Sequence, residues 1–91
     1  MNNDLFAGWR LVRTIEGHEG FIVWSVAISP DGKYIVSGSQ DKTLKLWEAG
    51  NGRLVRTFEG HNDSVYSVAF SPDGKNIVSG AFDKTIKLWG L

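Results

Sequence analysis

The chain has 91 residues, and its 10 basic and 10 acidic side chains give a formal net charge of zero. This balance argues against a protein that binds nucleic acid or an acidic membrane surface, because both partners select a basic excess. Cysteine is absent from the sequence, which excludes disulfide bonds and thiolate metal sites. Neither a basic segment nor a long apolar run follows Met1, so we expect no signal peptide, no membrane span and a cytoplasmic location.

After an N-terminal segment at residues 1–9, the chain is a series of short strands separated by turn residues. Residues 10–15 alternate and are β-branched, which predicts the first strand. Val23–Ile28 and Val65–Phe70 are almost continuously apolar, as expected of strands covered on both faces. Each of these two runs is followed by Ser-Pro-Asp-Gly, a sequence that reverses the chain. Further strands are predicted at residues 35–39, 43–47, 54–58, 77–81 and 85–89, so the protein is expected to be all-β.

The second half of the chain repeats the first. Trp47 and Trp89 are 42 residues apart, and residues 10–14 return 43 positions later as residues 53–57. A fixed period of this size indicates a stacked or ring-like repeat protein. Two units of this size bury little surface alone, and such repeats usually need three or more units for stability. The missing core must therefore come from elsewhere.

The repeated residues resemble the WD-repeat β-propeller family over residues 10–89. The resemblance rests on two Gly-His pairs, two Ser-Pro-Asp-Gly turns, an Asp in the following turn of each repeat and a Trp in each third strand. The sequence departs from the family pattern after each Trp, where Glu48 and Gly90 replace the usual Asp. The resemblance implies a β-propeller with two blades per chain. The first repeat then covers residues 10–52 and the second covers residues 53–91.

The resemblance also implies four strands in each blade, with the first strand nearest the central channel. The second blade then lacks its fourth strand. Leu11–Ile15 matches the fourth strand of a blade in sequence, but no blade precedes it. We therefore expect this strand of one chain to pair with Thr85–Trp89 of the next chain, which places Phe6 and Trp9 near Trp89 and Leu91 of that neighbour. The expected closure residues are Leu11, Val12, Arg13, Thr14, Ile15, Thr85, Ile86, Lys87, Leu88 and Trp89.

Identical two-blade chains force an even number of blades, which excludes the common number of seven. Eight blades from four chains is the favoured ring, because the short loops do not obstruct a wide ring, and a six-bladed trimer is the next choice. The alternative is an excised fragment of a longer WD-repeat protein, whose partner is the remaining blades. A natural and an engineered origin are equally compatible with the sequence.

His, Ser and Asp recur in both repeats and suggest a hydrolase. However, neither serine lies in a Gly-x-Ser-x-Gly elbow, and an active site has no need to appear in every repeat. In the family these residues and the strand Trp form a buried, hydrogen-bonded tetrad, and a fully paired network of this kind holds one packing arrangement. The implied structural tetrads are His18, Ser37, Asp41 and Trp47, and then His61, Ser79, Asp83 and Trp89.

We expect a non-catalytic scaffold without a cofactor, and two histidines 43 residues apart lack the spacing of a metal site. Family ligands often meet the face formed by the loops before the first strand and between the second and third strands. Aromatic side chains there would anchor a peptide or protein. Packing between blades is the alternative role for Trp24 and Tyr66. The implied partner-binding face consists of Phe21, Trp24, Gln40, Ser64, Tyr66 and Phe82.

Overall fold

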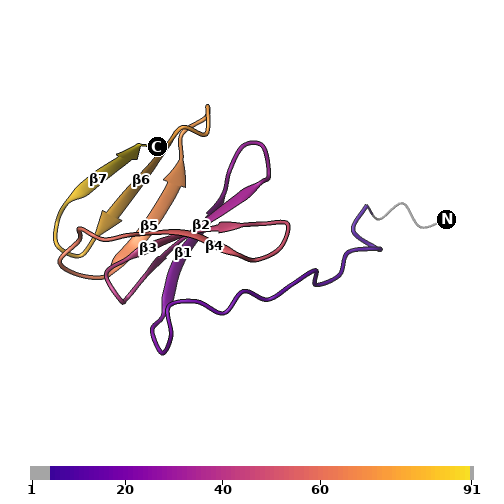
Figure 1. Cartoon of the computed structure of the whole chain (residues 1–91), viewed down its shortest axis with the longest axis horizontal. Helices are drawn as coiled ribbons and strands as arrows, with labels where there is room; N and C mark the ends of the chain where they lie inside the picture. The colour runs from indigo at the N-terminus through magenta and orange to yellow at the C-terminus, as the bar shows by residue number, and fades with distance from the viewer. Residues whose placement is uncertain (1–4, 91) are drawn as a thin grey trace.

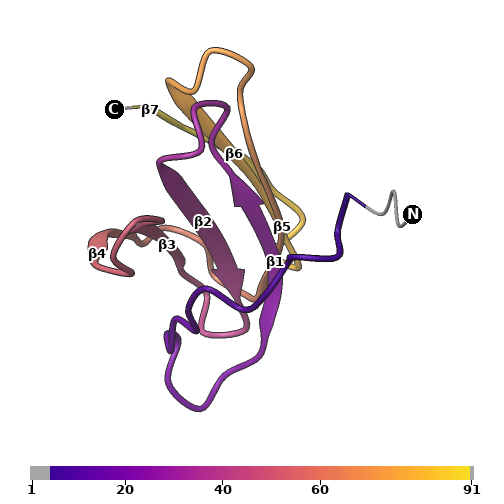
Figure 2. The same cartoon turned by 90° about the vertical axis from the view of Figure 1, so that its right-hand side faces the viewer.

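The computed structural model describes residues 5–90, and within them it contains seven strands in two antiparallel sheets (Figures 1 and 2). Consecutive strands are neighbours in both sheets, so each sheet is a meander. This confirms the predicted all-β class. Residues 5–90 include no helix that could span a bilayer. The first blade consists of β1 (Val23–Ile28), β2 (Tyr34–Ser39), β3 (Leu44–Glu48) and β4 (Leu54–Phe58), and the second consists of β5 (Val65–Phe70), β6 (Asn76–Ala81) and β7 (Ile86–Gly90).

The strand bounds follow the prediction closely, and the small shifts have a local cause. β1, β4 and β5 have the predicted bounds, and the other described strands differ by one residue at one or both ends. β3 begins at Leu44 because the Thr43 N–H donates to Asp41 Oδ1 over 2.9 Å, which makes Thr43 part of the preceding turn. Thr85 makes the corresponding bond in the second repeat, so β7 also begins one residue late.

Side-chain and backbone hydrogen bonds close the turns between the first two strands of each blade. Ser29 Oγ donates to Asp31 Oδ1 over 2.7 Å, and the Gly32 N–H donates to the Ser29 carbonyl over 2.9 Å. Gly32 has a φ of +75°, which glycine adopts without the steric cost that a side chain would bring. The turn that starts at Ser71 has the same two kinds of bond, and Gly74 has a φ of +72°. The repeat is therefore preserved in individual hydrogen bonds.

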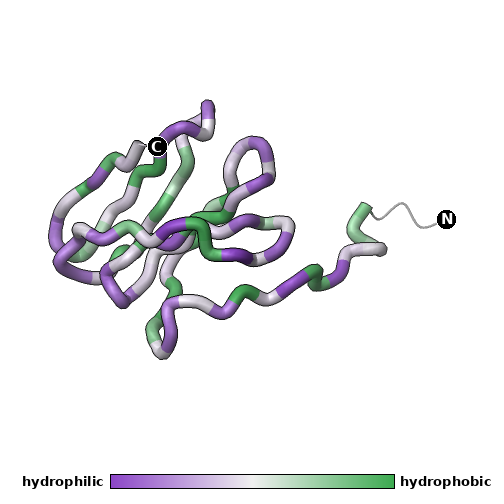
Figure 3. Tube along the Cα trace, in the orientation of Figure 1, coloured by the Kyte–Doolittle hydropathy of each residue, from purple (hydrophilic) through white to green (hydrophobic). Residues whose placement is uncertain are grey.

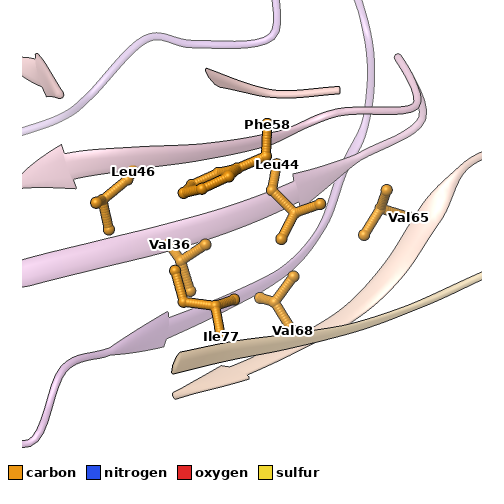
Figure 4. Close-up of a cluster of buried hydrophobic side chains, with 7 residues drawn as sticks. All are labelled: Val36, Leu44, Leu46, Phe58, Val65, Val68 and Ile77. Carbon is orange, nitrogen blue, oxygen red and sulfur yellow. The ribbon is translucent and has the colours of Figure 1, made fainter. Parts of the chain in front are cut away.

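The hydrophobic core lies between the two blades (Figure 4). Figure 3 shows hydrophobic residues along the strands and hydrophilic residues in many of the connecting turns. A Cβ at Gly38 would lie 2.8 Å from Val65 Cγ1 and 2.9 Å from Val68 Cγ1, so glycine allows the blades to approach closely. Each blade thus covers one face of the other. The core side chains are Val36, Leu44, Leu46, Phe58, Val65, Val68 and Ile77.

The strand predicted at residues 10–15 is absent, and these residues form an arm that leads away from the blades (Figure 1). The prediction is wrong for the single chain, because a strand needs a hydrogen-bonding neighbour and no described strand pairs with the arm. The base of the arm is held by Arg13, whose Nη2 donates to the Gly50 carbonyl over 2.6 Å. Leu11 and Val12 are exposed.

Candidate functional site

The first blade contains a buried chain of hydrogen bonds that joins a loop to two strands. Trp47 Nε1 donates to Ser37 Oγ over 2.9 Å, and Ser37 Oγ lies 2.7 Å from His18 Nε2. His18 Nδ1 lies 2.8 Å from Asp41 Oδ2. A neutral imidazole with its proton on Nδ1 satisfies every partner, since it donates to the carboxylate and accepts from the serine. The four residues of the first implied tetrad are therefore in mutual contact.

The second blade has the same arrangement. Trp89 Nε1 donates to Ser79 Oγ over 2.9 Å, Ser79 Oγ lies 2.7 Å from His61 Nε2, and His61 Nδ1 lies 2.9 Å from Asp83 Oδ2. Among the described residues, every buried side-chain nitrogen or oxygen has a hydrogen-bond partner. Each tetrad therefore ties the loop before the first strand of a blade to the rest of that blade.

Sequence reasoning missed Thr43 and Thr85, although the Asp-Lys-Thr triplet that contains them recurs in both repeats. Each threonine hydroxyl donates to the carboxylate of the preceding Asp over 2.6 Å. Burial acts to raise the pKa of Asp41, but hydrogen bonds, chiefly from Thr43, outweigh it and hold that pKa below its ordinary value. The hydroxyl of Thr85 is the largest cause that lowers the pKa of Asp83. Both carboxylates are thus ionised at neutral pH, as acceptors for the imidazoles.

The Ser-His-Asp distances match those of a hydrolytic triad, but burial makes the serine unsuitable as a nucleophile. Ser37 is only 5% exposed, and its oxygen already accepts the indole N–H of Trp47. Ser79 is buried and engaged in the same way by Trp89. A substrate carbonyl has no route to either hydroxyl, so the arrangement fits a structural role. Within residues 5–90, no three His, Asp or Glu side chains are grouped to hold a metal ion.

We expect Ser79→Ala to lower the free energy of unfolding by about 1–3 kcal/mol, because it leaves the buried His61 Nε2 and the partly buried Trp89 Nε1 without a partner. Urea denaturation of the purified chain measures this difference. Glu59→Ala changes an exposed side chain of the same repeat and should stay within about 0.5 kcal/mol of the unmodified chain. Equal midpoints for the two variants would contradict a structural tetrad.

Three exposed aromatic side chains from both blades meet on one surface, which we call the aromatic patch: Trp24, Tyr66 and Phe82. The rings of Trp24 and Phe82 meet edge to face with centroids 6.3 Å apart, and those of Tyr66 and Phe82 stack at 5.0 Å. Phe21 is also exposed. Large aromatic side chains are typical anchors in protein interfaces, so this patch can serve as a binding surface.

The two polar members of the sequence-implied face differ in their accessibility. Gln40 is exposed, and its Oε1 accepts the Ile22 N–H over 3.3 Å. Ser64 is only 8% exposed, and its hydroxyl donates to the Gln40 carbonyl over 3.5 Å. The assignment of Ser64 to a binding face is therefore wrong, because its side chain joins the second blade to the first.

The outer face of the second blade corresponds to the inner face of the first. Val36, Leu44 and Leu46 of the first blade are buried against the second blade. Their counterparts 42 residues later are all exposed, and Ile86 reaches 80%. Apolar side chains that gather on an exposed surface indicate an interaction site. The exposed counterparts are Val78, Ile86 and Leu88.

The outer face of the first blade provides the complementary half. Val65 and Val68 of the second blade are buried in the core, whereas Val23 and Val26, at the corresponding positions of the first blade, are exposed. Val26 is 64% exposed. The two outer faces therefore carry the same residue types as the two sides of the interface between the blades.

Comparison with known protein families matches the chain to two copies of one repeat. The WD40 family, described as "WD domain, G-beta repeat", matches residues 9–48 and 52–90. The first match contains β1, β2 and β3 with the preceding arm, and the second contains β4 to β7. The resemblance inferred from the sequence is thus confirmed.

Similar stretches occur in much longer proteins. The chain is 56% identical over 58 residues to "Transcriptional repressor rco-1" of Neurospora crassa, which covers 64% of this chain and 9% of that protein. It is 57% identical over 44 residues to "Ribosome biogenesis protein BOP1 homolog" of Drosophila grimshawi, covering 48% of this chain and 6% of that protein. The chain spans less than a tenth of the length of these relatives. Because the family match extends over both blades, this chain belongs to the WD40 repeat family.

Proposed function

We propose that this chain is a non-catalytic scaffold for protein interactions, which completes a β-propeller by head-to-tail association of identical two-blade chains. The supporting observation is the correspondence between the two exposed outer faces and the two sides of the interface inside the chain. When the second blade of one chain meets the first blade of the next, the buried interface is repeated. Such a contact is heterologous and forms a ring when the rotation closes.

Strand exchange completes the second blade in this assembly. In the first blade, β4 pairs with β3 so that Thr57 lies opposite Lys45, and Lys45 Nζ donates to Thr57 Oγ1 over 3.0 Å. The corresponding pair at the junction is Lys87 of one chain and Thr14 of the next. The arm thereby gains the partner strand that it lacks, and β7 no longer presents an open edge.

The favoured assembly has four chains and eight blades, and a trimer with six blades is the alternative ring. Each chain contributes two blades, so the ring has an even number of them. The aromatic patch would then recur once per chain on the same side of the ring. We propose that a peptide or protein partner binds there, since the patch presents exposed aromatic side chains from two blades.

A second candidate is a segment of a longer WD40 protein, in which further blades of the same polypeptide cover the outer faces. The small share of the relatives' length that this chain spans supports it. In that case the partner surface and the tetrads have the same roles. Only the origin of the neighbouring blades differs, so the two candidates are separated by the mass in solution.

Sedimentation or light scattering of the purified chain tests the proposal. One chain weighs 10.1 kDa, so four chains give about 40 kDa and three give about 30 kDa. Deletion of residues 1–15 is expected to abolish assembly, because it removes the strand that completes the second blade. A folded monomer at every concentration would rule out self-association and favour the longer protein. Assembly that persists after the deletion would exclude strand exchange.

A further inference from the structure

An apolar groove of about 270 Å³ lies between the two blades, beside β4 and the end of β7. Val55 and Phe58 line it from the first blade, and Trp89 and Gly90 line it from the second. The Phe58 and Trp89 rings are in contact, with centroids 5.4 Å apart. The Arg56 guanidinium lies 5.0 Å above the centre of the Phe58 ring. The surface of the groove is therefore mainly aromatic and aliphatic, although Asp31, Asp73 and Lys75 also line it.

Residues 5–8 form an apolar turn at the end of the N-terminal arm, away from the blades (Figure 3). The Trp9 N–H donates to the Phe6 carbonyl over 3.0 Å, and their rings meet edge to face at 4.7 Å. Trp9 is nevertheless 75% exposed. A tryptophan in this state leaves a large apolar area in water, which is favourable to bury against another surface.

The pairing inside the first blade predicts where this turn lies after strand exchange. The Glu48 N–H donates to the Arg53 carbonyl over 2.8 Å at the end of β3. The corresponding bond at the junction runs from Gly90 of one chain to Arg10 of the next. Trp9 of the next chain is therefore placed directly after the end of β7, where Gly90 borders the groove.

The first blade has Gly52 at the position that the tryptophan takes at the junction. A Cβ at Gly52 would lie 3.5 Å from Ile15 Cγ1 and 3.6 Å from Arg13 Cδ. The counterparts of these two residues, 43 positions later, are Phe58 and Arg56. A residue at this position of the second blade is consequently near the Phe58 ring and the Arg56 guanidinium beside the groove. Gly52 has a φ of +78°, whereas Trp9 has no positive φ, so this correspondence places the residue and not the direction of its side chain.

We infer that the groove receives Trp9 from a second copy of this chain, an inference that rests on the proposed head-to-tail association. The indole packs on Phe58 beside Val55, and the guanidinium of Arg56 is placed to stack on it. In the first blade the equivalent position is Gly52, so no side chain makes the corresponding contact with Ile15 and Arg13. Trp9 thus gives the junction between chains an anchor of its own and makes it stronger than repetition of the internal interface alone.

Association of the full chain, measured by sedimentation over a dilution series, tests this inference. Trp9→Ala is expected to raise the dissociation constant of the assembly by about 30-fold, as for the loss of a central tryptophan anchor. Leu5→Ala is the matched control, because it removes an exposed apolar side chain from the same turn and should change the constant by less than about 3-fold. Val55→Ala, on the groove side, is expected to weaken association as well. The double variant should lose less than the product of the two single effects, because the two residues share one contact.

Several outcomes would overturn the inference. If Trp9→Ala assembles as tightly as the unmodified chain, the groove does not bind the Trp9 side chain, although the ring proposal stands. Equal increases in the dissociation constant for Trp9→Ala and Leu5→Ala would indicate a nonspecific hydrophobic contribution of the arm rather than binding of the indole in the groove. Strictly multiplicative effects of Trp9→Ala and Val55→Ala would show that the two side chains do not meet. An unmodified chain that stays monomeric would overturn both this inference and the proposed assembly.

Discussion

A chain that carries both Thr14→Cys and Lys87→Cys is expected to become covalently linked into closed rings under mild oxidation. The two positions correspond to Thr57 and Lys45, which lie opposite each other in β4 and β3. The Cα atoms of opposite residues in an antiparallel pair are about 4.5–5.5 Å apart, within the range that a disulfide spans. Because the unmodified sequence has no cysteine, each band on a non-reducing gel counts the linked chains. The ladder should end at four chains.

Two controls make this result specific. Each single-cysteine variant should give no series of linked chains, since one cysteine per chain joins at most two copies. Arg13→Cys with Lys87→Cys shifts the arm by one residue and places the thiols on opposite faces of the sheet, so it should link poorly. A ladder that ends at three would replace the tetramer with a trimer. Absence of linked chains from the Thr14 and Lys87 pair would contradict strand exchange.

Gly38→Ala is expected to destabilise the folded chain, whereas Gly80→Ala, at the same position of the second repeat, should not. A Cβ at Gly38 would meet both valine side chains of β5 and lie 3.2 Å from the Val65 carbonyl oxygen. Overpacking of this kind costs about 1–3 kcal/mol, a large fraction of the stability of a small protein. At Gly80 the nearest atom is the Tyr66 hydroxyl at 3.7 Å, an ordinary contact. Urea unfolding at low protein concentration measures the difference.

Gly80→Ala is instead expected to weaken association by about 5- to 150-fold, the same overpacking cost expressed in affinity. In the proposed ring, Gly80 faces Val23 and Val26 of the next chain, which correspond to the valines that face Gly38. A dilution series of both variants measures the dissociation constant, with Glu59→Ala as a neutral control. Unchanged association of Gly80→Ala would show that the outer faces do not pack as the inner ones do.

The amino-acid sequence by itself determined the strands within the blades and the turns that connect the first two strands of each blade. Alternating or continuous apolar runs specify β1 to β7, and the Ser-Pro-Asp-Gly turns specify where the chain reverses, because both are local properties of the backbone and its neighbours. The resemblance to the WD-repeat family, which the repeated residues carry, implied the groups in which His18 and His61 lie.

Only the tertiary structure decided what is buried and which strands have a partner. Ser64 is polar and lies in a loop, yet the neighbouring blade covers it. Residues 10–15 have the composition of a strand but remain an arm, because strand formation depends on a neighbour that the single chain does not supply. Likewise, Ile86 and Leu44 are equivalent in sequence, but only Leu44 has a blade packed against it. Burial and strand pairing depend on which residues are neighbours in space, and the residue type alone does not determine these neighbours.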